Sequence, residues 1–122
     1  MRVHNGALTG RSILIVEDEP LIALEVHSAF NAAGASIVSA ANRKEALRMI
    51  SLPGLSAAVV DMNLGGSDCS DVCKRLSDSG IPFVLHTGDA RADILQKWPD
   101  APILTKLADK QRIVNVVAGI LR

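Results

Sequence analysis

Several polar residues of this chain directly follow short apolar runs, and their types suit a divalent metal ion. Glu17, Asp18, Asp61, Thr87 and Lys106 all hold such positions. A single polar residue in such a position would only indicate where a strand reaches the surface. Five such residues together indicate a functional site more specifically than any one of them does. Three carboxylates at one place would repel one another unless a cation lay between them. Oxygen ligands with little His or Cys nearby favour Mg²⁺, so we expect a magnesium site at the three acids.

These residues must be positioned by an alternation of strands and helices. β-branched and apolar runs predict five strands, and apolar residues at helical spacing predict helices between them, the fourth of which is short and weak. The expected strands cover residues 12–16, 36–40, 57–61, 81–86 and 101–105, and the expected helices cover 20–33, 43–50, 68–78, 89–96 and 113–121.

Such an alternation demands parallel strands with helices on both faces of the sheet, because each connection between parallel strands consumes a helix. We expect an α/β, doubly wound, five-stranded parallel sheet in the order 2-1-3-4-5. Its ligand site should lie beyond the carboxyl ends of strands 1 and 3, where the winding reverses. This places Glu17, Asp18 and Asp61 beside one another.

Composition limits the partners and the compartment. The chain of 122 residues has 13 basic and 13 acidic residues, so it lacks the positive field that attracts nucleic acid. No apolar run is long enough to span a membrane, and the start MRVHNGALTG has no apolar signal core. We expect one soluble cytoplasmic domain over residues 12–122, preceded by an extension at 1–11, as a monomer or weak dimer.

Cys69 and Cys73 lie on one face of an expected helix together with Val72 and Leu76. No further Cys and no nearby His completes a zinc set, so buried thiols are favoured over a metal or redox pair.

Four segments, ILIVEDEP, VVDMNL, FVLHTG and ILTK, resemble the receiver domain of bacterial two-component response regulators, over residues 12–121. DMNLGG with IPFVLHTG further resembles the FAT GUY branch of single-domain receivers, although His86 and Asp89 replace the Ala and the aromatic residue of that motif. The resemblance implies a flavodoxin-like fold in which a phosphoryl group is received by a carboxylate in the presence of Mg²⁺. It assigns roles as follows: Asp61 is the phospho-acceptor, Glu17, Asp18, Asp61 and the backbone carbonyl of Asn63 hold the metal, and Thr87 and Lys106 contact the phosphoryl group.

Two positions depart from the family's pattern. Leu107 replaces the Pro that usually follows the Lys, and a cis bond before Leu would cost about 2.5–4 kcal/mol. Ile103 replaces the aromatic residue that usually changes position with the Thr. We therefore expect the protein to signal through this face in a non-standard way.

The leading interpretation is a receiver that obtains its phosphoryl group from a histidine kinase or phosphotransfer protein and signals by contact with a downstream protein. The alternative is a pseudo-receiver that binds proteins without phosphorylation. A phosphatase is disfavoured because Asn63 replaces a second Asp, and a flavin site is disfavoured by the acids at residues 17–19. We expect His86 to be a partly exposed spacer rather than a proton relay, and Trp98 to be a packing residue.

Overall fold

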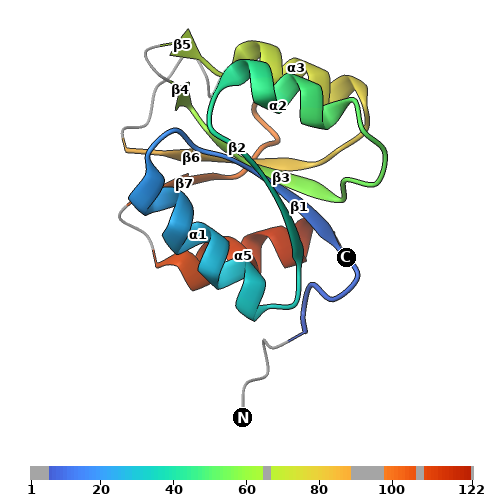
Figure 1. Cartoon of the computed structure of the whole chain (residues 1–122), viewed down its shortest axis with the longest axis vertical. Coiled ribbons are helices and arrows are strands. Elements are labelled where there is room, and N and C mark those ends of the chain that lie inside the picture. The colour runs from blue at the N-terminus through green and yellow to red at the C-terminus, as the bar shows by residue number, and fades with distance from the viewer. Residues whose placement is uncertain (1–5, 65–66, 89–97, 107–108, 122) are drawn as a thin grey trace.

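Strands and helices alternate along the chain in a computed structural model, which describes residues 6–64, 67–88, 98–106 and 109–121 (Figure 1). Strands β1 (Ser12–Val16), β2 (Ser36–Ala40), β3 (Ala57–Asp61), β6 (Phe83–Thr87) and β7 (Ile103–Thr105) form one sheet. Its order is β2-β1-β3-β6-β7 and all its pairings are parallel. The expected sheet, in the order 2-1-3-4-5, is confirmed.

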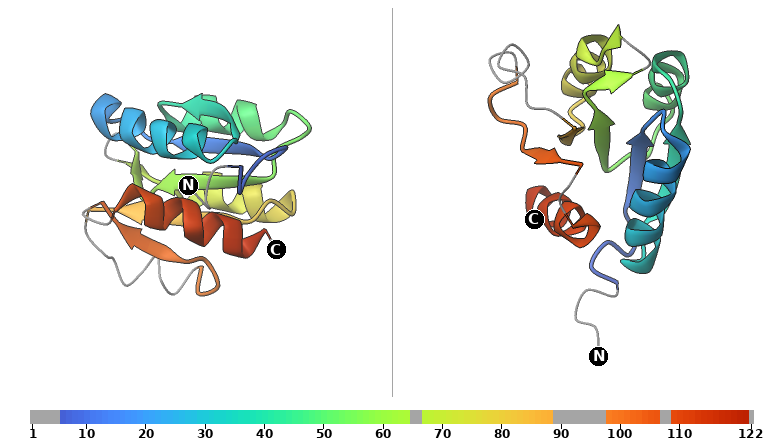
Figure 2. Two further views of the ribbon diagram at one scale, coloured as in Figure 1. Left: turned by 90° about the horizontal axis from the view of Figure 1, so that it is seen from below. Right: turned by 90° about the vertical axis from the view of Figure 1, so that its left-hand side faces the viewer.

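Helices cover both faces of this sheet, as in a doubly wound fold. Helices α2 (Arg43–Ile50) and α3 (Ser70–Asp78) lie together on one face, and α1 (Pro20–Ala32) and α5 (Lys110–Ile120) lie together on the other (Figure 1). Seen from below, α1 and α5 stand in front of the sheet (Figure 2). Strand residues point alternately to the two faces, so Leu14 and Val60 pack with α2 and α3, whereas Ile13 and Val59 pack with α1 and α5.

Local sequence explains where several helices begin. Pro20 starts α1, where its missing N–H costs nothing. The Asn42 side chain accepts a hydrogen bond from the Glu45 N–H at 2.9 Å, and the Glu45 carboxylate accepts one from the Ala41 N–H at 2.8 Å. Side chains thus satisfy free backbone donors at the start of α2. Among the described residues, no helix is both long enough and apolar enough to cross a membrane.

The segment before β1 packs against the core, which the polar sequence MRVHNGALTG did not suggest. Leu8 is 1% exposed and lies among the apolar side chains beneath α1 and α5. Its N–H donates to the Ala33 carbonyl at 2.9 Å, and the Arg11 carbonyl accepts from the Ser36 N–H at 2.9 Å. Residues 6–11 therefore cover the end of this core layer.

Several element boundaries differ from those expected; the largest difference is that α5 begins at Lys110 rather than at residue 113. The fourth and fifth strands of the sheet begin at Phe83 and Ile103, directly after Pro82 and Pro102, which have no N–H to donate to the ladder. Helix α3 begins at Ser70, two residues later than expected, because Asn63–Leu64 (β4) and Ser67–Asp68 (β5) form a small antiparallel ladder before it. The short helix expected at 89–96 lies outside the described residues.

The packing of the first segment can be tested at Gly34. Gly34 has a φ of +89°, and a Cβ there would lie 2.7 Å from Thr9 Oγ1. Gly54 has a φ of +103° but open space around it, which makes it the matched control. We expect Gly54→Ala to lower the free energy of unfolding by about 1 kcal/mol, from the left-handed backbone alone. Gly34→Ala should lower it by about 1–2 kcal/mol more, because Thr9 must also move.

Equilibrium urea unfolding measures both losses. In the double variant that also carries Thr9→Ala, part of the extra loss should be recovered. Equal losses for Gly34→Ala and Gly54→Ala would contradict the packing of residues 6–11 against Gly34.

Candidate functional site

The site lies where the parallel strands end, because neighbouring strands end at one edge of the sheet. In the register of the sheet, Val16 of β1 stands beside Val60 of β3, and Asp61 stands beside His86 of β6. The Glu17 N–H continues the ladder by donating to the Ala40 carbonyl at 3.0 Å. The residues that follow β1 and β3 are therefore neighbours in space although they are far apart in the sequence.

Glu17, Asp18 and Asp61 come together as expected. One carboxylate oxygen from each lies within 4.8 Å of the others. Glu17 and Asp61 are 4% and 3% exposed, whereas Asp18 is more accessible. Oxygen ligands of this number and charge, open to solvent on one side, fit Mg²⁺, which binds through few carboxylates and keeps part of its water.

Lys106 joins this cluster from β7, two strands away from Asp61. Its ammonium Nζ donates to Glu17 Oε2 and to Asp61 Oδ2, each at 3.1 Å. The backbone fixes its place, because the Lys106 N–H donates to the Thr87 carbonyl at 2.7 Å. One partly buried cation thus bridges the two buried carboxylates.

The charges in the cluster shift the pKa values of its members. The pKa of Glu17 rises from 4.5 to about 7, first because of burial and then because of hydrogen bonding to and repulsion from Asp61. Burial alone would lower the pKa of Lys106, but its contacts with Glu17 and Asp61 outweigh that effect and raise it. Adding positive charge to the cluster therefore favours the ionised form of Glu17.

The remaining residues with expected roles stand at or near the same edge. Thr87 ends β6 and is buried, and Asn63 begins β4 two residues after Asp61. Ile103 begins β7 and packs, partly buried, against the core layer beneath α2 and α3. The roles given to these residues stay predictions. Leu107 and the geometry of its peptide bond lie outside the described residues.

The expectation that His86 is a partly exposed spacer is wrong. Its side chain is 2% exposed, and its Nδ1 lies 3.9 Å from Glu17 Oε1. Burial lowers the pKa of His86 to about 4, and the positive charges of Lys110 and Lys106 add to this effect. His86 is therefore a neutral imidazole behind the acidic cluster, in a place that its neighbours in the sequence did not reveal.

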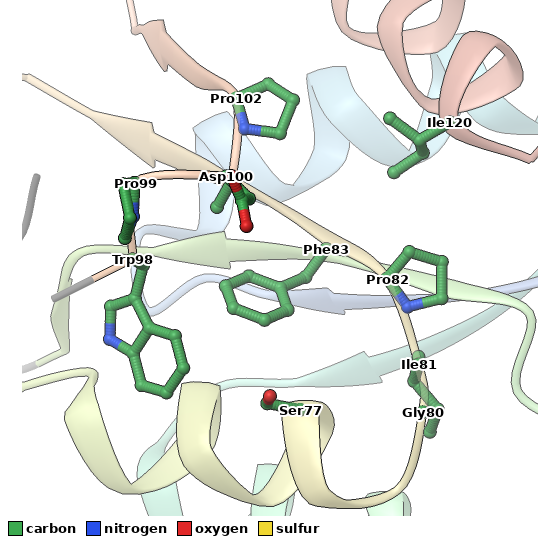
Figure 3. A pocket seen from close by; sticks show the side chains of 11 residues that line it. Ser77, Gly80, Ile81, Pro82, Phe83, Trp98, Pro99, Asp100, Pro102 and Ile120 are labelled. Carbon is green, nitrogen blue, oxygen red and sulfur yellow. The ribbon is translucent and has the colours of Figure 1, made fainter.

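Two further expectations concern residues away from the edge, and both are confirmed. The thiols of Cys69 and Cys73 are buried and not joined by a disulfide, and their sulfur atoms lie 3.6 Å apart. Trp98 packs edge to face against Phe83, with ring centroids 5.7 Å apart. These two rings line an open, mostly apolar hollow of about 530 Å³ (Figure 3). It lies at the amino end of β6, a strand length away from the acidic cluster.

Comparison with known proteins assigns the chain to a family. Residues 13–118 match the family described as "Response regulator receiver domain". The chain is 27% identical over 103 residues to sporulation initiation phosphotransferase F of Bacillus subtilis (strain 168), covering 83% of each protein. The sequence thus belongs to a domain family used in two-component and phosphorelay signalling.

Solved structures agree with this assignment. The BeF3-activated conformation of SdrG from Pseudomonas melonis Fr1 matches with a TM-score of 0.77 and 31% identity, covering 93% of this chain and 98% of that one. A CheY-like receiver from Methanospirillum hungatei JF-1 matches with a TM-score of 0.81 at 20% identity, covering 91% and 93% respectively, which supports the fold. The protein is a response regulator receiver domain, a signalling module rather than an enzyme. Its place in the FAT GUY branch stays a prediction.

The raised pKa of Glu17 predicts a pH dependence of stability. The native carboxyl holds its proton more tightly than the unfolded one, so the stability present below about pH 4.5 is lost as the pH rises to about 7. Relative to Glu17→Gln, which does not titrate, the metal-free wild type should lose free energy of unfolding across this window. One pKa unit corresponds to about 1.4 kcal/mol, so we expect a loss of the order of a few kcal/mol.

Urea unfolding in a chelator at several pH values measures this difference. Glu25→Gln, on the exposed side of α1, is the matched control and should follow the wild type. Parallel profiles for the wild type and Glu17→Gln would contradict the burial of Glu17 beside Asp61.

Proposed function

We propose that this receiver accepts a phosphoryl group on Asp61, in a Mg²⁺-dependent reaction, from a histidine kinase or a histidine phosphotransfer protein. The observation that carries the proposal is the cluster itself. Asp61 ends its strand beside two further carboxylates, and its Oδ2 lies 3.1 Å from the Lys106 ammonium. A nucleophile, a metal-binding set and a cation are the three parts that phosphoryl transfer to a carboxylate requires.

Asp61 supplies the nucleophile. Its carboxylate is buried, and its backbone is held by the sheet and by the Met62 N–H, which donates to the His86 carbonyl at 3.0 Å. In the reaction, one Asp61 oxygen forms a bond to phosphorus while the bond from phosphorus to the donor's imidazole nitrogen breaks. The electron pair of that bond stays on the imidazole, which takes up a proton. The fixed carboxylate needs little reorganisation for an in-line attack.

Glu17, Asp18, Asp61 and the backbone carbonyl of Asn63 would hold the Mg²⁺. When bound, Mg²⁺ neutralises charge on the oxygens of the phosphoryl group. Burial and the neighbouring Asp61 raise the pKa of Glu17, so a bound cation would convert Glu17 fully to a carboxylate. Lys106 would then be available to the phosphoryl group from the other side.

Thr87 and Lys106 would report the phosphorylated state. The phosphoryl group adds negative charge, which attracts the Lys106 ammonium and offers acceptors to the Thr87 hydroxyl. The two residues are joined through their backbones, because the Thr87 carbonyl accepts from the Lys106 N–H. A movement of one therefore reaches the other. Ile103 carries no ring that could exchange places with Thr87, so we propose that the response passes through the ends of β6 and β7.

The relatives support the choice of partners. The Bacillus subtilis relative is named a phosphotransferase, and the SdrG structure is described as a BeF3-activated conformation. These names fit the two partners that we propose. One is a protein that donates the phosphoryl group from a histidine, and the other is a downstream protein that recognises the phosphorylated receiver. We also propose residues 12–122 as the receiver and 1–11 as its extension, a division supported by the family match at residues 13–118.

Phosphorylation can be tested directly at Asp61. The wild type should gain the mass of one phosphoryl group when it is incubated with acetyl phosphate and Mg²⁺, and should not gain it in a chelator. Asp61→Asn should gain none, because an amide oxygen is a far weaker nucleophile than a carboxylate. Intact-protein mass spectrometry measures the gain. Asp78→Asn, which alters an exposed carboxylate on α3, is the control and should be labelled like the wild type.

A second donor separates this proposal from a pseudo-receiver. If neither acetyl phosphate nor a panel of autophosphorylated histidine kinases labels Asp61, the phosphorylation-independent binding module becomes the better account. Equal labelling of the wild type and Asp61→Asn would place the acceptor elsewhere and contradict the proposal.

A further inference from the structure

The two oxygens of Glu17 have different surroundings. Oε2 accepts hydrogen bonds from the Glu19 N–H at 3.2 Å and from Lys106 Nζ at 3.1 Å. Oε1 is buried and has no hydrogen-bond partner among the described residues. A buried oxygen without a partner costs free energy, and the carboxylate is held through Oε2 alone. We therefore expect a hydrogen-bond donor to contact Oε1 when the acidic cluster binds a metal ion.

His86 is the polar side chain that faces Oε1. Its Nδ1 lies 3.9 Å from Oε1, and its Nε2 is buried without a hydrogen-bond partner in the described part of the chain. The strand fixes its position, because His86 stands directly beside Asp61 in the register of β3 and β6. The nitrogen that faces the partnerless oxygen is therefore Nδ1, while Nε2, on the far side of the ring, is the buried nitrogen without a partner.

His86 does not belong to the metal-binding set itself. Among the described His, Cys, Asp and Glu side chains, only Glu17, Asp18 and Asp61 lie close enough together to share an ion. The imidazole is neutral, because burial and the charges of Lys110 and Lys106 disfavour its proton. A neutral imidazole has one N–H to donate and one nitrogen that can accept. An apolar side chain would fill this buried position without an unsatisfied nitrogen, so filling space does not explain the imidazole.

We propose that His86 is a positioning residue, which donates a hydrogen bond from Nδ1 to Glu17 Oε1 and so fixes the carboxylate for metal binding. The present separation of 3.9 Å exceeds a hydrogen bond of about 2.9 Å. Rotation of the Glu17 side chain can close it once Lys106 no longer holds Oε2. Residues that do not themselves bind the metal orient metal-binding carboxylates by hydrogen bonds of this kind. The inference rests on the proposed function of the acidic cluster.

Three variants separate positioning from packing. His86→Leu fills the space without a donor, and His86→Asn places an amide N–H close to where Nδ1 stands. His27→Gln, on the exposed side of α1, is the matched control. We expect His86→Leu to weaken Mg²⁺ binding about tenfold or more, and His86→Asn and His27→Gln to stay within about threefold of the wild type. Calorimetric titration of the unphosphorylated proteins with Mg²⁺ measures this, and urea unfolding in a chelator reports stability separately.

A spectroscopic measurement on the wild type gives an independent answer if His86→Leu does not fold. The imidazole nitrogen shifts of ¹⁵N-histidine-labelled protein with Mg²⁺ at pH 8 show which nitrogen carries the proton. We expect the form protonated on Nδ1, and a shift of that nitrogen when Mg²⁺ is added.

The outcomes distinguish this inference from the proposed function. If the wild type binds no Mg²⁺, the proposed function itself fails. If it binds Mg²⁺ and His86→Leu binds equally well, only the positioning role is overturned. A proton on Nε2 in the Mg²⁺-bound wild type would also overturn it, and so would a loss of affinity in His86→Asn as large as that in His86→Leu.

Discussion

The contact of one lysine with two buried carboxylates is the interaction on which the site depends. Glu17 and Asp61 are almost fully buried beside each other, and Lys106 Nζ lies 3.1 Å from both. Without that cation, both carboxylates would lack charge compensation in a region of low dielectric constant. Lys106 reaches them because β7 pairs with β6 and β6 with β3, so the strand order of the sheet is also the condition for this contact.

The same contact suggests how the site could change state. Lys106 has one ammonium group, and Glu17 and Asp61 share it. A phosphoryl group on Asp61 would be a stronger attraction for that ammonium, and a metal ion would take over the neutralisation of Glu17. His86, neutral and buried behind Glu17, is well placed to hold the oxygen that Lys106 does not reach. The proposed transfer, the metal set and the positioning role of His86 are therefore parts of one charge balance.

Much of this arrangement could be predicted from the sequence, because it follows from the pattern of apolar runs. The sequence predicts that the first strand ends at Val16 and the third at Asp61, and β1 and β3 end at these residues. The meeting of Glu17, Asp18 and Asp61 then follows from the parallel order of the strands. Helical spacing also predicts the burial of Cys73 in α3, and Cys69, which directly precedes that helix, is buried as well.

Other features depend on contacts between distant segments, which the local pattern does not contain. Leu8 is surrounded by polar and small residues in the sequence, yet it covers the core beneath α1 and α5. His86 ends an apolar run, which suggests an exposed position, but β7 pairs with β6 beside it and its side chain is 2% exposed. Pro82 and Pro102 delay two strands, a local effect that could have been read from the missing N–H groups. Burial of a polar residue at a strand end, by contrast, requires the neighbouring strand to be known.

The position of Lys106 in the activated protein tests the central claim most directly. A structure of the protein with Mg²⁺ and beryllium fluoride, by crystallography or by NMR, would show both the modified carboxylate and the ammonium. This account predicts beryllium fluoride bound to the Asp61 carboxylate. Lys106 Nζ should contact the beryllium fluoride and should no longer contact Glu17 Oε2. If Lys106 kept its contact with Glu17 while Asp61 carried the fluoride group, the shared lysine would not be the element that changes state.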